Sequence, residues 1–216
     1  MDFKRARSNE QIQSRMDEIV CAAAKIYDES GYENITFTSI AEITNFTRPT
    51  IYKYFSTKEE ILLKLLSTDL DTWSKTLITS FKLNTIYTTK QISKIWAKSY
   101  SAQTRLLELC SILFTIIEKN VSLEALADFK ASIFNSINPV YELISQLYPK
   151  ADLARIYYFL TIQQSVVLGL YPMCNPSETQ KEAIKLSKTN INVPDFEEAF
   201  EKALFQLMYF LEQNIE

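Results

Sequence analysis

Histidine is absent from this chain of 216 residues, and cysteine occurs only three times. Without histidine the chain lacks the commonest general base and the commonest metal ligand, which excludes most zinc and catalytic-triad chemistry. Cys21, Cys110 and Cys174 are odd in number and widely spaced, so we expect no disulfide framework and interpret them as small buried hydrophobic residues. We therefore predict a protein that is not an enzyme, with no cofactor, no metal site and no catalytic residue.

Long apolar runs are also missing. No run approaches the roughly 20 residues that span a bilayer, and the first residues lack the apolar core of a signal peptide. We expect a cytoplasmic protein with no membrane partner, because scattered unpaired cysteines suit a reducing compartment. The net charge is −3. A nucleic-acid-binding protein of this composition must therefore concentrate its positive charge in one place.

Glycine and proline are scarce as well, at two and six residues, while hydrophobic residues make up 47% of the chain. Because alternating Val/Thr stretches are almost absent, this composition predicts an all-α protein. Gly31 is expected to end the first helix, and Pro139 to kink or split a later one. The expected helices cover residues 9–30, 37–44, a second short helix from 48, then 57–81, 89–101, 104–119, 122–147, 151–169, a short helix opened by Ser177 and Gln180, and 195–214.

The stretch 35–58 predicts two short helices joined by a tight turn. Apolar residues bracket Thr36 and Thr47 at the spacing of a hydrophobic staple, so each threonine can cap a helix. Pro49 falls in the first turn of the second helix, where its missing N–H costs nothing. The chain must reverse between the helices, and we expect Asn45 to adopt a positive φ there. This is the helix-turn-helix arrangement, whose second helix enters the major groove of DNA.

The second helix presents a basic surface in an otherwise acidic chain. Ile51 and Phe55 are expected to point inward. No acidic residue occurs between residues 45 and 58, and three basic residues do. The expected outward side chains are Arg48, Thr50, Lys53 and Tyr54, with Lys58 in the first turn of the next helix.

At these residues the sequence resembles the DNA-binding domain of TetR (tetracycline-repressor-like) transcriptional regulators. The shared parts are the Ile-Ala pair at 40–41, the Thr-Ile-Tyr-x-Tyr-Phe run at 50–55 and the Lys-Glu-Glu run at 58–60. The family usually has glycine where this chain has Asn45, and asparagine can supply the same backbone geometry. Beyond the N-terminal domain, only the length and the helical layout agree with the family.

The resemblance implies an N-terminal three-helix DNA-binding domain at 9–60 and a larger C-terminal helical ligand-binding and dimerisation domain at 61–216. The arm at 1–8 is either a solvated tail or a basic segment that touches DNA. Within this DNA-binding domain (the head), Thr50 and Lys53 occupy the positions expected to contact base edges, with Arg48 beside them. The expected contacts to phosphate or the groove edge are Tyr52, Tyr54, Lys58, Thr36 and Thr38.

The resemblance also implies an effector pocket in the second domain. An aromatic-lined cavity suits a small, largely apolar or aromatic effector, although most of these side chains would equally serve as plain core. Gln163 and Gln164 either satisfy buried groups at an interface, which we favour, or hydrogen-bond a ligand. The candidate lining residues are Trp96, Tyr100, Cys110, Phe114, Phe129, Tyr141, Tyr157 and Gln163.

Two expected helices, 151–169 and 195–214, are apolar on nearly every side, and a chain of this size cannot cover both. Pairing each with its copy in a second chain would bury them in a four-helix interface. The predicted interface residues are Gln164, Val167, Phe200, Leu204, Leu207 and Leu211.

The sequence thus predicts a ligand-responsive repressor that binds a palindromic double-stranded DNA operator as a homodimer and leaves it when a small effector binds. The alternative is a helical enzyme or ligand carrier, and binding of a specific DNA duplex separates the two classes.

Overall fold

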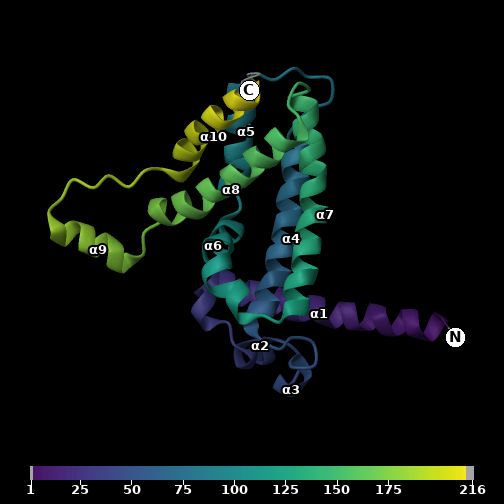
Figure 1. Cartoon of the computed structure of the whole chain (residues 1–216). Helices are drawn as coiled ribbons and strands as arrows, with labels where there is room; N and C mark the ends of the chain where they lie inside the picture. Colours follow the sequence, from purple (N-terminus) through teal and green to yellow (C-terminus); the bar gives the residue numbers. More distant parts are fainter. Residues whose placement is uncertain (1, 213–216) are drawn as a thin grey trace. The chain divides into compact units, whose positions relative to one another are not determined.

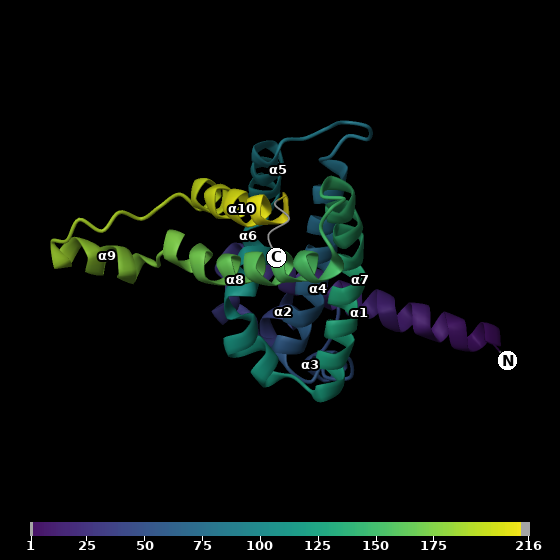
Figure 2. The same ribbon diagram turned by 45° about the horizontal axis from the view of Figure 1, so that its top comes forward.

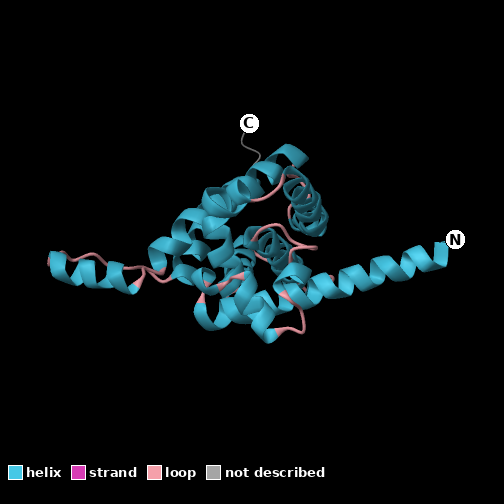
Figure 3. Cartoon of the chain, turned by 90° about the horizontal axis from the view of Figure 1, so that it is seen from below, coloured by secondary structure: helices cyan, strands magenta, loops and turns pink. Residues whose placement is uncertain are grey.

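The computed structural model describes the backbone of residues 2–212 and the side chains of residues 9–212, and it contains no strand in that range (Figure 3). The all-α prediction is therefore confirmed. None of the described helices combines the length and apolarity needed to cross a membrane. The α-helices are α1 (Asp2–Ser30), α2 (Phe37–Ile43), α3 (Arg48–Ile51), α4 (Lys58–Thr79), α5 (Thr89–Ser101), α6 (Thr104–Ile112), α7 (Leu123–Leu147), α8 (Leu153–Cys174), α9 (Glu178–Ser187) and α10 (Phe196–Glu212) (Figure 1).

The chain forms two compact units. The first comprises Met1–Thr68 and Ile112–Ser132, and the second comprises Asp69–Ser111 and Ile133–Glu216. This division differs from the single boundary at residue 60 that the sequence suggests, because the segment 112–132 packs with the N-terminal helices. Helices α4 and α7 each contribute residues to both units.

In the first unit, local signals set the limits of α1 and α2. Gly31 has a φ of +78° and its N–H donates to the carbonyl of Tyr27, which ends α1 as predicted. Thr36 caps α2 through a reciprocal capping box with Ser39, in which the Thr36 hydroxyl accepts from the Ser39 N–H at 3.0 Å. The staple residue Ile35 is fully buried. The unpredicted part is Ser39, since a capping box more often carries Glu or Gln at that position.

The turn after α2 forms in a different way from the one predicted. Asn45 does not have a positive φ, which among described non-glycine residues is found at Asn84 and Lys188. Thr44 makes the turn instead: its backbone is extended and its hydroxyl donates to the carbonyl of Ile40 at 2.9 Å. The Ile40 carbonyl thus accepts from both the N–H and the hydroxyl of Thr44, and the chain leaves α2 without a left-handed residue.

Helix α3 is a single turn. Thr47 occupies its N-cap position, but the Thr47 hydroxyl bonds the hydroxyl of Thr50 at 2.9 Å rather than a backbone N–H, so the predicted side-chain cap is wrong. Pro49 lies in the first turn as expected. Ile51 and Phe55 are buried, which confirms that they point inward and hold α3 against the rest of the unit.

Two prolines behave differently from the prediction. Helix α7 runs through Pro139 without interruption, and α8 continues through Pro172 to Cys174 instead of ending near residue 169. The predicted helix 104–119 is also modified: α6 ends at Ile112, followed by a π-helical turn, Leu113–Ile117, and a short 3₁₀ turn, Glu118–Asn120. Such departures from the α-helical turn, wider in the π-helix and tighter in the 3₁₀ turn, are not indicated by the hydrophobic periodicity.

The core of the second unit is aromatic. The rings of Trp73 and Tyr100 lie 4.3 Å apart, and the rings of Tyr100 and Phe200 lie 5.5 Å apart at nearly a right angle. Trp96 is also fully buried. Helix α10 packs against both α5 and α8, as Figure 2 shows.

Because of this packing, the apolar surface available to a second chain differs from the predicted dimer interface. Val167, Phe200, Leu204 and Leu211 are buried in the core of their own chain, whereas Gln164 and Leu207 are half-buried. The expectation that one chain cannot cover both helices missed α5, which covers one side of α10. The exposed large apolar residues of these two helices are Leu153, Tyr157, Tyr158 and Met173 on α8, and Phe205, Tyr209 and Phe210 on α10.

The three cysteines also differ from one another. Cys110 is buried and burial raises the pKa of its thiol to about 12, which fits a small hydrophobic residue. Cys174 is half-buried, but Cys21 is exposed on α1, so its predicted burial is wrong.

Candidate nucleic-acid interface

The predicted DNA contacts all lie in the first unit, on α2, on α3 and the turn that follows it, and at the start of α4. Thr36, Thr38, Arg48, Tyr52 and Lys53 are exposed, while Thr50, Tyr54 and Lys58 are half-buried. Their side chains can therefore reach solvent. Ile40 of α2 and Ile51 of α3 are buried on the opposite, inward side of their helices.

Two tyrosines of this surface are held by neighbouring side chains. The Tyr52 ring packs edge-on against Phe37, with ring centroids 4.3 Å apart, although 51% of Tyr52 remains exposed. The hydroxyl of Tyr54 accepts a hydrogen bond from Arg15 Nη1 at 3.3 Å. Arg15 on α1 is absent from the predicted set, because the sequence does not indicate which face of α1 meets the tyrosine.

A third aromatic side chain positions Lys58. The Lys58 ammonium lies 3.9 Å from the centre of the Tyr32 ring, a cation–π contact. The Tyr32 hydroxyl donates to Glu59 at 2.8 Å, and burial together with this carboxylate raises the pKa of Tyr32 well above its ordinary value. Lys58 therefore stands at the N-terminus of α4, where unpaired N–H groups and the helix dipole already favour an anion such as a DNA phosphate.

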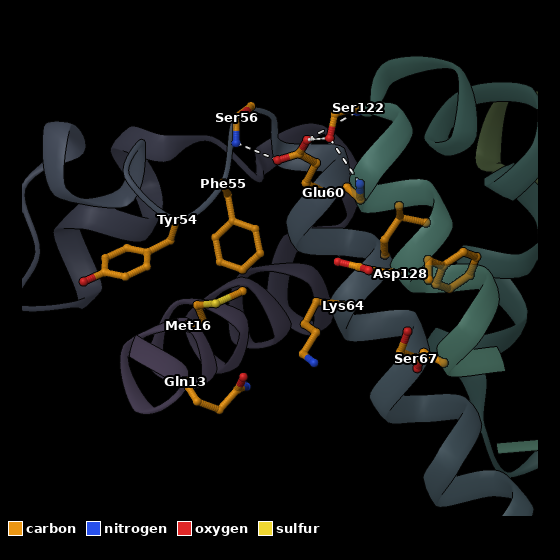
Figure 4. Close-up of a pocket in the computed structure, with 14 residues that line it drawn as sticks. Gln13, Met16, Tyr54, Phe55, Ser56, Glu60, Lys64, Ser67, Ser122 and Asp128 are labelled. Carbon is orange, nitrogen blue, oxygen red and sulfur yellow. Dashed lines mark hydrogen bonds between the residues drawn. The ribbon is translucent and has the colours of Figure 1, made fainter. Parts of the chain in front are cut away.

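Glu60 links the segment after α3 to the beginning of α7. Its carboxylate accepts from the Ser56 N–H at 2.7 Å, from the Ser122 hydroxyl at 2.7 Å and from the Ser122 N–H at 3.3 Å (Figure 4). The Thr57 hydroxyl accepts from the Glu60 N–H at 3.2 Å as predicted, and the Thr57 backbone in turn interacts with the Glu60 carboxylate and lowers its pKa. The same carboxylate also binds Ser122, a partner 62 residues away in the chain that the sequence does not indicate.

These hydrogen bonds make Glu60 sensitive to pH. Burial alone raises the pKa of its carboxyl, but the bonds from Ser122 and Ser56 outweigh burial and hold the pKa below its ordinary value of 4.5. The stabilising contribution of the carboxylate is therefore present above the unfolded-state pKa and is lost as the pH falls through the lower folded-state pKa.

We expect Glu60→Gln to lower the free energy of unfolding by about 1–2 kcal/mol at neutral pH and to reduce its loss at acidic pH. Urea unfolding between about pH 3 and about pH 7 measures both effects. The control is Glu124→Gln, since Glu124 is exposed on α7. A pH profile of Glu60→Gln identical to that of the unchanged protein would contradict this assignment.

The candidate effector residues do not form one cluster. Trp96, Tyr100, Cys110 and Gln163 are buried in the second unit, where burial raises the pKa of Tyr100. Phe114 and Phe129 belong to the first unit. In the second unit Tyr141 is half-buried and Tyr157 is 65% exposed.

The buried part of this set contains unpaired polar atoms. Trp96 Nε1 and Gln163 Oε1 are buried and have no hydrogen-bond partner. The neighbouring Gln164 Oε1 accepts from the Tyr100 hydroxyl at 3.4 Å. One donor and one acceptor are thus left over in an aromatic core, and each unpaired group costs roughly 1–3 kcal/mol.

A one-turn helix with exposed Arg48 and half-buried Thr50, set against α2 and followed by exposed Lys53, defines a helix-turn-helix DNA-binding protein. Residues 19–65 match the family model described as "Bacterial regulatory proteins, tetR family", and residues 67–209 match "Tetracyclin repressor-like, C-terminal domain". The chain therefore belongs to the TetR family, as the sequence resemblance indicates, and is a TetR-family transcriptional regulator.

Relatives of known sequence agree over the head of the protein. The HTH-type transcriptional regulator HbdR of Aromatoleum sp. (strain CIB) is 34% identical over 64 residues, which are 30% of this chain and 28% of that protein. The HTH-type transcriptional regulator YfiR of Bacillus subtilis (strain 168), itself uncharacterized, is 33% identical over 64 residues, which are 30% of this chain and 31% of that protein. The chain thus spans less than a third of the length of these curated relatives.

Solved structures agree over nearly the whole chain. A candidate tetR family transcription regulator from Shewanella sp. PV-4 has a TM-score of 0.53 at 14% identity, covering 90% of this chain and 96% of that one. The fatty acid degradation regulator FadR from Bacillus halodurans has a TM-score of 0.51 at 18% identity, covering 93% and 96%. At these identities the likeness shows the fold alone.

Proposed function

We propose that this protein is a repressor that binds a palindromic operator as a homodimer and is released by a small effector. The observation that carries the proposal is the exposed basic surface around α3 in a chain whose net charge is −3. Local positive charge of this kind is what a DNA-binding protein of acidic composition requires.

Within this surface, we assign the side chains to base contacts or to phosphate contacts according to their position and their neighbours. Arg48, Thr50 and Lys53 lie on α3 and the turn after it, so we assign them to base edges in the major groove. Tyr52, Tyr54 and Lys58 are braced by Phe37, Arg15 and Tyr32 respectively, which suits phosphate contacts that set the position of the head. Thr36 and Thr38 at the start of α2 complete the backbone contacts. The N-terminal arm, residues 1–8, was considered as a DNA contact, but its side chains lie outside the described residues.

The dimer is supported by an apolar surface on α8 and α10. Tyr158 and Phe210 stand 6.4 Å apart between ring centres and line a groove of about 560 Å³, together with Phe159 and Leu207. Phe205 and Tyr209 extend the same helix with stacked rings. Exposed aromatic surface of this extent marks an interface in soluble proteins, and a two-fold pair presents two heads to half-sites roughly 34–36 Å apart.

The effector is assigned to the aromatic core of the second unit. A ligand that accepts from Trp96 Nε1 and donates to Gln163 Oε1 would satisfy both unpaired atoms. A hydroxyl, carboxylic acid or amide group on an apolar or aromatic body has this chemistry. Helix α4 is continuous and contributes residues to both units. A ligand that binds more tightly to one tilt of α4 would therefore also affect the head.

We expect Lys53→Ala to change which sequences the protein prefers, with losses of about 1–3 kcal/mol at the base pair it reads. Lys58→Ala should instead weaken binding to all duplexes and reduce the salt dependence by about one phosphate per head. The measurement is selection of bound duplexes from a random library, followed by titrations at several salt concentrations.

Lys94→Ala, an exposed lysine on α5, is the matched control and should change neither property. If Lys53→Ala lowers affinity equally for every sequence, Lys53 is a phosphate contact and the base assignment is wrong. If the unchanged protein selects no duplex at all, the proposed operator binding itself fails.

A further inference from the structure

The first unit contains a cavity of about 430 Å³ that the proposed function does not use. Figure 4 shows it between α1, the segment after α3, and the neighbouring parts of α4 and α7. All the residues that line it belong to the first unit, whereas the aromatic core assigned to the effector belongs to the second unit. Its volume falls in the range of small-molecule sites, roughly 300–1,000 Å³.

Part of the wall of this cavity is apolar. Met16 comes from α1, Phe55 from the segment after α3, Leu63 from α4 and Phe129 from α7. Phe55, Leu63 and Phe129 are each at most 4% exposed. These side chains provide a surface on which the hydrocarbon part of a ligand could pack.

The rest of the wall carries two opposite charges and a hydroxyl. The ammonium of Lys64, the carboxylate of Asp128 and the hydroxyl of Ser67 line the cavity, and none of the three makes a hydrogen bond or ion pair within the described residues. Ser67 is 8% exposed, whereas Asp128 is an exposed residue of α7. The carboxylate of Glu60, by contrast, is already occupied by Ser56 and Ser122.

We propose that this cavity binds a small zwitterion with an apolar body, of the kind represented by a free amino acid with an apolar side chain. The ligand carboxylate pairs with Lys64 and accepts from Ser67, while its ammonium pairs with Asp128. The apolar side chain packs against Met16 and Phe129. Charge-assisted hydrogen bonds of this type are stronger than those between neutral groups.

The position of the site ties such a ligand to DNA recognition. Tyr54 and Phe55 line the cavity, and the hydroxyl of Tyr54 is held by Arg15 on the surface assigned to phosphate. A molecule in the cavity therefore contacts the segment that follows α3. This is a second small-molecule site, independent of the effector site of the proposed function.

The test is calorimetric titration of the full chain with L-phenylalanine and with L-leucine, without DNA. We expect saturable binding of at least one of them with a Kd of about 1 mM or tighter. Asp128→Asn and Lys64→Gln should each weaken it about tenfold, whereas Glu124→Gln on the same helix as Asp128 should not. Phenethylamine and 3-phenylpropionate, which each keep one charge of phenylalanine, should also bind about tenfold more weakly.

Trp96→Phe separates this site from the effector site, and binding should persist in that variant. The proposal is overturned if neither amino acid binds, if Asp128→Asn and Lys64→Gln bind as tightly as the unchanged chain, or if binding disappears in Trp96→Phe alone. Because operator DNA is absent from the titration, failure of the repressor proposal would leave this result unaffected.

Discussion

Tyr158→Glu should leave the protein monomeric and lower its affinity for a palindromic operator by about 100-fold or more. Tyr158 is 55% exposed on α8 and faces Phe210 of α10 across the apolar groove. In the proposed dimer, a carboxylate placed there in each copy would lose its hydration on burial. A monomer binds only one half-site, and loses the gain of roughly 10²–10⁴ that linked binding provides.

Sedimentation of the variant, together with operator titration, measures both effects. The matched control is Leu186→Glu, because Leu186 is an exposed leucine on α9, outside the apolar surface of α8 and α10. It should remain dimeric and bind the operator normally. A stable native monomer of the unchanged 25.0 kDa chain would show that this surface is not a dimer interface.

Gln163→Leu should lower the affinity for an effector about tenfold while changing the free energy of unfolding by less than about 1 kcal/mol. The acceptor that this change removes, Gln163 Oε1, is buried and unpaired in the protein without ligand. Gln164→Leu is the contrasting variant: it deprives the Tyr100 hydroxyl of its acceptor, and should destabilise the chain by about 1–2 kcal/mol.

The effector itself can be sought among phenols and aromatic carboxylic acids by thermal stabilisation of the full chain. Calorimetric titration of a stabilising compound, with and without operator, then measures the coupling. We expect DNA to weaken the effector by the same factor as the effector weakens DNA, about 5–150-fold, with the dimer intact. Equal effector affinity in both titrations would remove the regulatory part of the proposed function, and unchanged binding to Gln163→Leu would place the effector elsewhere.

Interactions between residues close in sequence were predictable from the sequence. The end of α1 at Gly31, the cap of α2 by Thr36 and the capping box that opens α9 at Ser177 and Gln180 all form as expected. Each depends on hydrogen bonds within about four residues, so the neighbouring side chains suffice to determine it. The helix-turn-helix and its outward and inward faces follow from the same short-range signals.

Other features depended on partners that the sequence does not place. Asn45 was expected to make the turn with a positive φ, but α2 ends at Thr44, whose N–H and hydroxyl both donate to Ile40. The local contacts of Glu60 with Thr57 were expected, but the bond from Ser122 to the same carboxylate was not. In the same way, tertiary packing and not sequence spacing brings Arg15 of α1 to Tyr54 and Tyr32, in the 3₁₀ turn after α1, to Lys58.

The burial of apolar side chains was also only partly predictable from the sequence. The sequence by itself determined that the chain is all-α, that α8 and α10 are rich in apolar residues, and that the head is a helix-turn-helix. Only the tertiary structure decided that Phe200 and Leu204 are covered by their own chain, that Phe129 lies in the first unit, and that Tyr158 remains exposed. The reason is physical: periodicity shows which side chains share a helix face, but burial depends on which distant segment covers that face.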